Sequence, residues 1–119
     1  SADIQEQYGK KVEEKLSAFA KSDAYPQFLK KSVEALVEEV GEGAVVYVRK
    51  SDLEKCRALS VRGVGRFEES SKIRLGGAMA SNSSGTVFAV DTLESRLEEQ
   101  KEAFKQKADL AIDTGEVND

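Results

Sequence analysis

The residue types that most enzymes use for catalysis are nearly missing from this chain of 119 residues. It contains no histidine and a single cysteine, Cys56. Histidine acid–base chemistry, a Ser-His-Asp triad, and zinc sites built from histidine or several thiolates are therefore excluded. A lone cysteine cannot form an internal disulfide, and no histidine is present to activate it as a nucleophile. We interpret Cys56 as an ordinary helix residue, and we expect no catalytic residue, no cofactor and no metal site.

Neighbouring carboxylates are the next group that could do chemistry. They form four pairs, Glu13-Glu14, Glu38-Glu39, Glu68-Glu69 and Glu98-Glu99. General acid–base catalysis needs carboxyl groups that converge in a pocket, whereas consecutive residues of a helix point about 100° apart. The three pairs in predicted helices are therefore interpreted as solvated faces. No D-x-D-x-D-G loop is present to bind calcium.

A basic segment leaves one alternative function open, that of a small nucleotide- or nucleic-acid-binding domain. Residues 49–74 carry 8 Lys and Arg against 4 Asp and Glu, and Arg62-Gly63-Val64-Gly65-Arg66 could in principle hold a phosphate. However, the G-x-G-x-x-G and G-x-x-x-x-G-K-[ST] patterns are absent. The segment offers few aromatic side chains for base stacking, and the whole chain has a net charge of −4. We therefore favour an exposed turn at residues 62–66.

Two amphipathic helices are predicted in the first third of the chain. The first covers residues 3–21, and its apolar face consists of Ile4, Tyr8, Val12, Leu16 and Phe19. Two interpretations of this face stay open: it forms a seam with a partner helix, or it packs on its own domain. A break around Pro26 separates it from a second helix over residues 26–40, which Gly41 is expected to cap.

The middle of the chain predicts a small sheet. Residues 44–49 indicate a central strand buried on both faces. Ser51 and Glu54 form a capping-box pattern that predicts a short helix to about Leu59. Its inner face would contain Leu53, Cys56 and Leu59. Residues 60–75 fit either a short edge strand or a loop.

A β-hairpin and a long helix follow. Residues 78–81 and 86–90 flank the polar turn 82–85. The last helix begins at Asp91-Thr92, capped by Asp91 with Glu94 or by Thr92 with Ser95, and is expected to fade near Ile112.

The order of these elements predicts an α+β fold. It is a two-layer domain with a small mixed β-sheet packed by helices, preceded by an N-terminal helical arm. The arm is residues 1–24, the head domain 25–112, and an acidic flexible tail 113–119. The longest apolar run, Ala44–Val48, is too short to span a membrane. Because the chain does not begin with Met, we expect it to be part of a longer protein.

Residues 76–97 contain the most informative pattern. A Gly-Gly pair opens a strand, a turn and a second strand follow, and a helix begins with Thr-Leu-Glu-x-Arg-Leu. The residues concerned are Gly76, Gly77, Asp91, Thr92, Leu93, Glu94, Arg96 and Leu97. This pattern resembles the C-terminal signature of the E subunit of V-type and archaeal A-type ATPases, with Asp91 where that family often has Asn. Physically, the glycines suit positive φ or close backbone approach. Arg96 suits an ion pair with Asp91 or Glu99, which we favour, or a contact with a partner.

The resemblance implies a non-catalytic stator of the peripheral stalk, cytoplasmic and attached to the membrane only through the complex. The arm would form a coiled coil with a second stalk subunit, called G or H. The head would bind the N-terminal barrel of the nucleotide-binding B subunit, in a hetero-oligomer that couples ATP hydrolysis or synthesis to proton or sodium transport. The partner-helix interface would then be the face of residues 4–19 described above.

Overall fold

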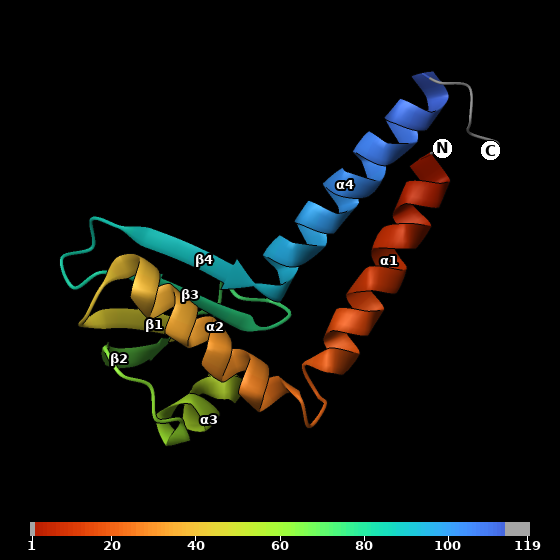
Figure 1. Ribbon diagram of the computed structural model, residues 1–119. Helices are drawn as coiled ribbons and strands as arrows, with labels where there is room; N and C mark the ends of the chain where they lie inside the picture. Colours follow the sequence, from red (N-terminus) through yellow and green to blue (C-terminus); the bar gives the residue numbers. More distant parts are fainter. Residues whose placement is uncertain (1, 114–119) are drawn as a thin grey trace.

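The computed structural model describes residues 2–113, which form a head and a helical arm (Figure 1). The elements in order are α1 (Ala2–Phe19), α2 (Tyr25–Val40), β1 (Ala44–Val48), the 3-10 turn η1 (Lys50–Asp52), α3 (Leu53–Ala58), β2 (Val64–Glu69), β3 (Gly77–Ser81), β4 (Phe88–Thr92) and α4 (Leu93–Asp113). The strands form one mixed sheet in the order β2-β1-β3-β4. The predicted two-layer α+β fold is therefore confirmed. The predicted tail lies outside the described residues, except for Asp113.

The central position of β1 follows from its uninterrupted apolar sequence. β1 pairs in parallel with β2 and antiparallel with β3, and β3 pairs antiparallel with β4. Every residue of β1 is buried except Tyr47, which is half-buried. The prediction of a central strand is confirmed, and so is the hairpin β3–β4. Residues 60–75, for which a strand and a loop were both open, contain the edge strand β2.

The core lies between the sheet and α2, which crosses in front of the strands in Figure 1. Leu29, Val33 and Leu36 of α2 are at most 2% exposed and recur at helical spacing on one face. They belong to one cluster with the covered face of the sheet, including Val46 and Ala80. Full burial of one such side chain contributes about 1.5–3 kcal/mol. The helix predicted over residues 26–40, with its glycine cap, is confirmed.

The predicted capping box at the short helix is wrong. Ser51 lies inside η1, and Asp52 takes the N-cap position of α3 without a capping hydrogen bond from its side chain. The Glu54 carboxylate accepts a hydrogen bond from Arg57 at 3.1 Å instead. The capping box does not form because the 3-10 turn over Lys50–Asp52 precedes α3 and leaves Ser51 one residue before the N-cap position. The predicted inner face is retained, since Cys56 is fully buried.

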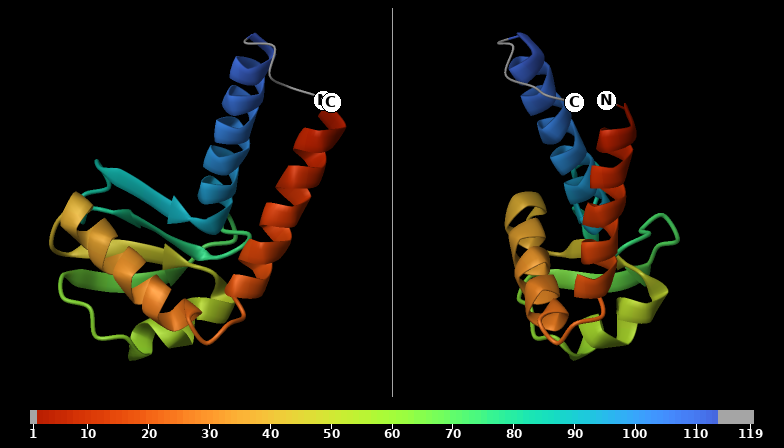
Figure 2. Two further views of the ribbon diagram at one scale, coloured as in Figure 1. Left: turned by 45° about the vertical axis from the view of Figure 1, so that its right-hand side comes forward. Right: turned by 90° about the vertical axis from the view of Figure 1, so that its right-hand side faces the viewer.

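Two helices, α1 and α4, lie side by side and extend from the sheet in the same direction (Figures 1 and 2). We call this pair the arm from here on, and it includes α4 in addition to the α1 of the predicted arm. The rings of Tyr8 on α1 and Phe104 on α4 stack with centroids 4.4 Å apart and planes 10° apart. The longest dimension of the molecule is 52 Å. Among residues 2–113, none of the helices combines the length and the apolar character that crossing a bilayer requires.

Candidate partner-binding site

The eight residues of the family-like pattern gather at one place, which we call the motif corner. It lies where β3 begins, β4 ends and α4 begins, and it comprises Gly76, Gly77, Asp91, Thr92, Leu93, Glu94, Arg96 and Leu97. Register pairing places Gly77 opposite Thr92. The strand pairing therefore brings the two halves of the pattern into contact, although the hairpin separates them in sequence.

Both glycines of the motif corner are required by the space around them. Gly76 has φ +143° and Gly77 has φ +81°. A Cβ atom on Gly77 would lie 2.5 Å from the carbonyl oxygen of Asp91, and one on Gly76 would lie 2.8 Å from the Tyr25 hydroxyl. The Gly76 carbonyl accepts a hydrogen bond from the Leu93 N–H at 2.9 Å. A side chain at either position would push the start of α4 away from the sheet.

A buried polar network supports this corner from behind, and the sequence did not predict it. The hydroxyl of Tyr25 donates to Asp52 at 2.7 Å and accepts from the Gly77 N–H at 2.8 Å. Arg49 donates two hydrogen bonds to the same carboxylate, at 3.0 and 3.1 Å. Tyr25 and Asp52 are both fully buried. The one useful signal would have been that Asp52, an acidic residue next to a helix start, is buried. Its burial depends on the tertiary fold and cannot be read from the local sequence.

Burial shifts the titration of two groups around this network. Burial away from solvent is the main cause that raises the pKa of Tyr25 above its ordinary range, and the carboxylate of Asp52 acts in the same direction. The hydrogen bond from the Gly77 N–H acts in the opposite direction and lowers this pKa. Burial also raises the pKa of the Cys56 thiol to about 12, with Asp52 acting in the same direction. A thiol with such a pKa is a poor nucleophile at neutral pH. Tyr25 and Cys56 therefore act as structural groups.

The start of α4 is fixed by side chains of the motif corner. The Thr92 hydroxyl accepts a hydrogen bond from the Ser95 N–H at 3.1 Å, so the Thr92 register of the two predicted caps is correct. Asp91 instead accepts from Arg96 at 2.9 Å and from the Ser32 hydroxyl at 2.5 Å. The predicted pairing of Arg96 with Asp91 is confirmed.

The other acidic residue of the corner holds the chain that leads into β3. The Glu94 carboxylate accepts hydrogen bonds from the backbone N–H groups of Arg74 and Leu75. Leu93 and Leu97 are buried in the core cluster. The motif corner therefore anchors α4, and Arg96, whose side chain is 43% exposed, remains reachable by a partner.

The predicted partner-helix face lies against the chain's own elements over most of its length. Tyr8 stacks on Phe104, while Val12, Leu16 and Phe19 pack against the core cluster. Ile4, near the beginning of α1, is 43% exposed. The structure thus brings at least four of the five residues into contacts within the chain, and their role in binding a second subunit stays a prediction.

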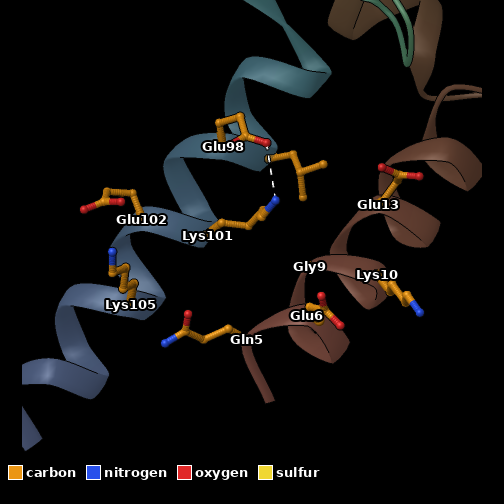
Figure 3. Close-up of a pocket in the computed structure, with 10 residues that line it drawn as sticks. Gln5, Glu6, Gly9, Lys10, Glu13, Glu98, Lys101, Glu102 and Lys105 are labelled. Atoms are coloured by element: carbon orange, nitrogen blue, oxygen red, sulfur yellow. Dashed lines mark hydrogen bonds and ion pairs between the residues drawn. The ribbon is translucent and has the colours of Figure 1, made fainter. Parts of the chain in front are cut away.

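A groove of about 640 Å³ runs between α1 and α4 (Figure 3). Its walls consist of Gln5, Glu6, Gly9, Lys10 and Glu13 from α1, and Leu97, Glu98, Lys101, Glu102 and Lys105 from α4. A Cβ on Gly9 would lie 3.4 Å from the Lys101 stem, an ordinary contact distance, so Lys101 lies directly against α1 at this position. Acidic and basic groups line both walls. Within residues 2–113, no group of three or more His, Cys, Asp or Glu side chains could hold a metal ion.

The basic segment offers less free positive charge than its sequence suggests. Arg49, Arg57, Arg66 and Arg74 each have a carboxylate partner within 3.1 Å. The Gly63 carbonyl accepts hydrogen bonds from the N–H groups of Gly43 and Ala44, which leads the chain directly into the β1–β2 pair. The turn predicted over residues 62–66 is therefore limited to Arg62 and Gly63, and the prediction is wrong for residues 64–66, which belong to β2.

A scan against protein-family models finds no match for this chain, and no curated protein matches it. The resemblance described above therefore depends on the residues of the motif corner and on the order of the elements.

Proposed function

We propose that this chain is a non-catalytic peripheral-stalk (stator) subunit of a rotary V- or A-type ATPase. The observation that carries the proposal is the two-helix arm, in which α4 begins at the motif corner and α1 joins the head just before α2. In this role the arm binds a helix of a second stalk subunit, and the head binds the N-terminal barrel of the nucleotide-binding B subunit. The protein is cytoplasmic and resists the torque of rotation while ATP turnover is coupled to ion transport.

The shape and charge of the arm groove support binding of a helix. A partner helix is about 10 Å across and lies along a neighbour by inserting side chains between ridges. The groove between α1 and α4 runs along the arm and is lined by both signs of charge. A partner helix with lysines opposite Glu6 and Glu102 and acidic residues opposite Lys10 and Lys105 would complement it.

The attachment of the arm to the head supports a role in transmitting mechanical force. A stator must transmit force from the arm into the head without local unfolding. Three interactions hold α4 to the head. Arg96 forms an ion pair with Asp91, the Glu94 carboxylate accepts a hydrogen bond from the chain before β3, and the Leu93 N–H donates a hydrogen bond to the Gly76 carbonyl. Buried Tyr25 connects the same corner to the start of α2, which follows α1. Both helices of the arm are therefore connected to the same hydrogen-bonded part of the head.

The direct test mixes this chain with the C-terminal half of the candidate stalk partner and measures mass by size-exclusion chromatography with light scattering. We expect a one-to-one complex, and a ternary complex when the B-subunit barrel is added. The variant Lys101→Glu/Lys105→Glu should weaken binding of the helix, whereas Lys50→Glu on the exposed η1 turn should not. A chain that remains alone with both partners present contradicts the proposal.

A further inference from the structure

The strand register defines a second surface, which we call the open face of the sheet. It consists of the side chains opposite the α2-covered face: Val45, Tyr47, Arg66, Glu68, Met79, Ser81, Phe88 and Val90. The covered face holds their sequence neighbours, such as Val46 and Ala80, in the core cluster. The open face is therefore the other side of a sheet that α2 covers on one side, although Val45 and Ser81 at the start of β1 and the end of β3 are themselves buried.

Large apolar side chains are exposed on this face. Phe88 is 68% exposed and Val90 is 59% exposed, and both point to the same side of β4. Burial of such a side chain contributes about 1.5–3 kcal/mol of stabilisation. Leaving two of them exposed side by side on one face is therefore unfavourable. An exposed apolar patch on a sheet marks a binding surface more often than an isolated apolar residue does.

A hollow of about 420 Å³ lies on the same face. Its walls include Tyr47, Met79, Phe88 and Val90 from the strands, and Lys72 from the chain that follows β2. Because β4 begins at Phe88 and ends near the point where β1 and β2 end, Phe88 lies toward one end of the strands and Lys72 toward the other. The hollow therefore extends along the strand direction, with the Phe88 ring as its wall at one end and Lys72 toward the other end.

The charges of the open face are self-complementary. Among the strand residues that define this face, the charged ones are Arg66 and Glu68, two positions apart on β2 and paired with each other at 2.7 Å. Consider a two-fold axis that lies in the plane between two facing sheets and runs perpendicular to their strands. This axis would place β2 of one copy against β2 of the other, with the two strands running in opposite directions. Arg66 of each copy would then meet Glu68 of the other. The same axis would place each Phe88 ring toward the hollow of the opposite copy.

From this geometry we propose that the open face binds a second copy of this chain, in a symmetric face-to-face pair of sheets. Two sheets packed in this way lie about 10 Å apart, and a two-fold interface uses the same residues on both sides. Residues 75–90, which include most of β3 and β4, carry no charge. The contact therefore brings no like charges together over β3 and the apolar half of β4, although the chain as a whole carries −4.

The test is sedimentation equilibrium of the chain from about 1 μM to about 1 mM, which covers the range of weak and moderate dimers. We expect a monomer–dimer equilibrium that Phe88→Asp abolishes. Leu110→Asp is the matched control, because Leu110 is 65% exposed on α4, far along the chain from the sheet. That control should leave the dimer unchanged, and circular dichroism should show that both variants are folded.

Charge reversal tests the axis itself. Arg66→Glu alone and Glu68→Arg alone each place like charges across the interface and should raise the dimer Kd by about tenfold. The double swap Arg66→Glu/Glu68→Arg restores opposite charges in both copies and should recover affinity. A chain that is monomeric at the highest concentration overturns the proposal. So does a dimer that is lost in Leu110→Asp, or one that the double swap weakens as much as the single changes.

Discussion

The hydroxyl of Tyr25 accepts a hydrogen bond from the backbone N–H of Gly77 at 2.8 Å, which joins the first turn of α2 to the first residue of β3. The same hydroxyl donates to Asp52, so one oxygen connects three segments of the chain. A buried donor or acceptor that loses its partner costs about 1–3 kcal/mol, and more if it is charged. The phenol therefore determines how the motif corner sits on the core.

Replacing this phenol should be costly. Tyr25→Phe keeps the ring but leaves the Gly77 N–H without its acceptor and removes one donor from the buried Asp52 carboxylate. We expect a loss of about 2–4 kcal/mol in the free energy of unfolding in urea. Tyr47→Phe, at a half-buried position on the open face, is the control and should change stability by less than about 0.5 kcal/mol. Equal effects in the two variants would contradict the structural role of Tyr25.

The glycine pair gives a second prediction. Gly77→Ala would add a Cβ 2.5 Å from the Asp91 carbonyl at φ +81°. We expect a loss of about 3 kcal/mol or more, because both the backbone and a strand partner must move. Gly85→Ala has a similar φ of +71°, but apart from its two chain neighbours no described atom lies within 4 Å of the new methyl group. Only the backbone cost of about 1 kcal/mol should therefore appear. Thermal denaturation of the two variants side by side separates crowding from conformational strain.

The ion pair at the start of α4 should outweigh the exposed pairs. Asp91→Ala removes the acceptor of both Arg96 and Ser32, and we expect a loss of about 1–2 kcal/mol. Glu54→Ala removes the exposed partner of Arg57 and should cost less than about 0.5 kcal/mol. Chemical denaturation at low and high salt measures both. An Asp91 variant as stable as the Glu54 variant would show that the pair does not fix α4.

The buried thiol predicts an alkaline loss of stability. The folded protein holds the Cys56 proton up to a pKa of about 12, whereas an unfolded thiol titrates near 8.5. The unfolded state therefore binds fewer protons above pH 9, and stability falls as pH rises from about 9 toward 12. The slope from this group approaches about 1.4 kcal/mol per pH unit.

The control for this pH effect is Cys56→Ala, which should show a smaller decrease in the free energy of unfolding with pH. The comparison is made between about pH 9 and 10, because Tyr25 contributes only at higher pH. Folded wild-type protein should also resist alkylation by iodoacetamide at about pH 8, because Cys56 is fully buried. Rapid alkylation without unfolding would contradict both expectations.

The stacked rings of Tyr8 and Phe104 should hold the arm closed. Phe104→Ala removes this contact, which is worth about 0.5–1.5 kcal/mol beyond its buried area. Hydrogen exchange in α1 should then accelerate at the Tyr8 end, while β1 and β3 keep their protection. Leu110→Ala, at an exposed position of the same helix, is the control. Faster exchange throughout the head would show that the arm is not an independent unit.

The sequence predicted those elements whose signals are local. The helical stripe of α2, the apolar run of β1 and the hairpin around Asn82 are each contained in a short window, and the structure confirms them. The capping box failed because the 3-10 turn η1 precedes α3, and within that turn the Asp52 carboxylate accepts a hydrogen bond from Tyr25, a residue 27 positions away. No local pattern reports such a contact. For the same reason the sequence left open whether the face of α1 packs on the chain itself.

The pairing of α1 with α4 also has a consequence for the order of folding. Tyr8 and Phe104 are separated by nearly the whole chain, so closing that contact directly from the unfolded state would incur a large loop entropy. Once the sheet and α2 have formed, the two helices already start from neighbouring points and the remaining search is short. We therefore expect the helices of the arm to pair last on refolding and to separate first in denaturant, with the head still intact.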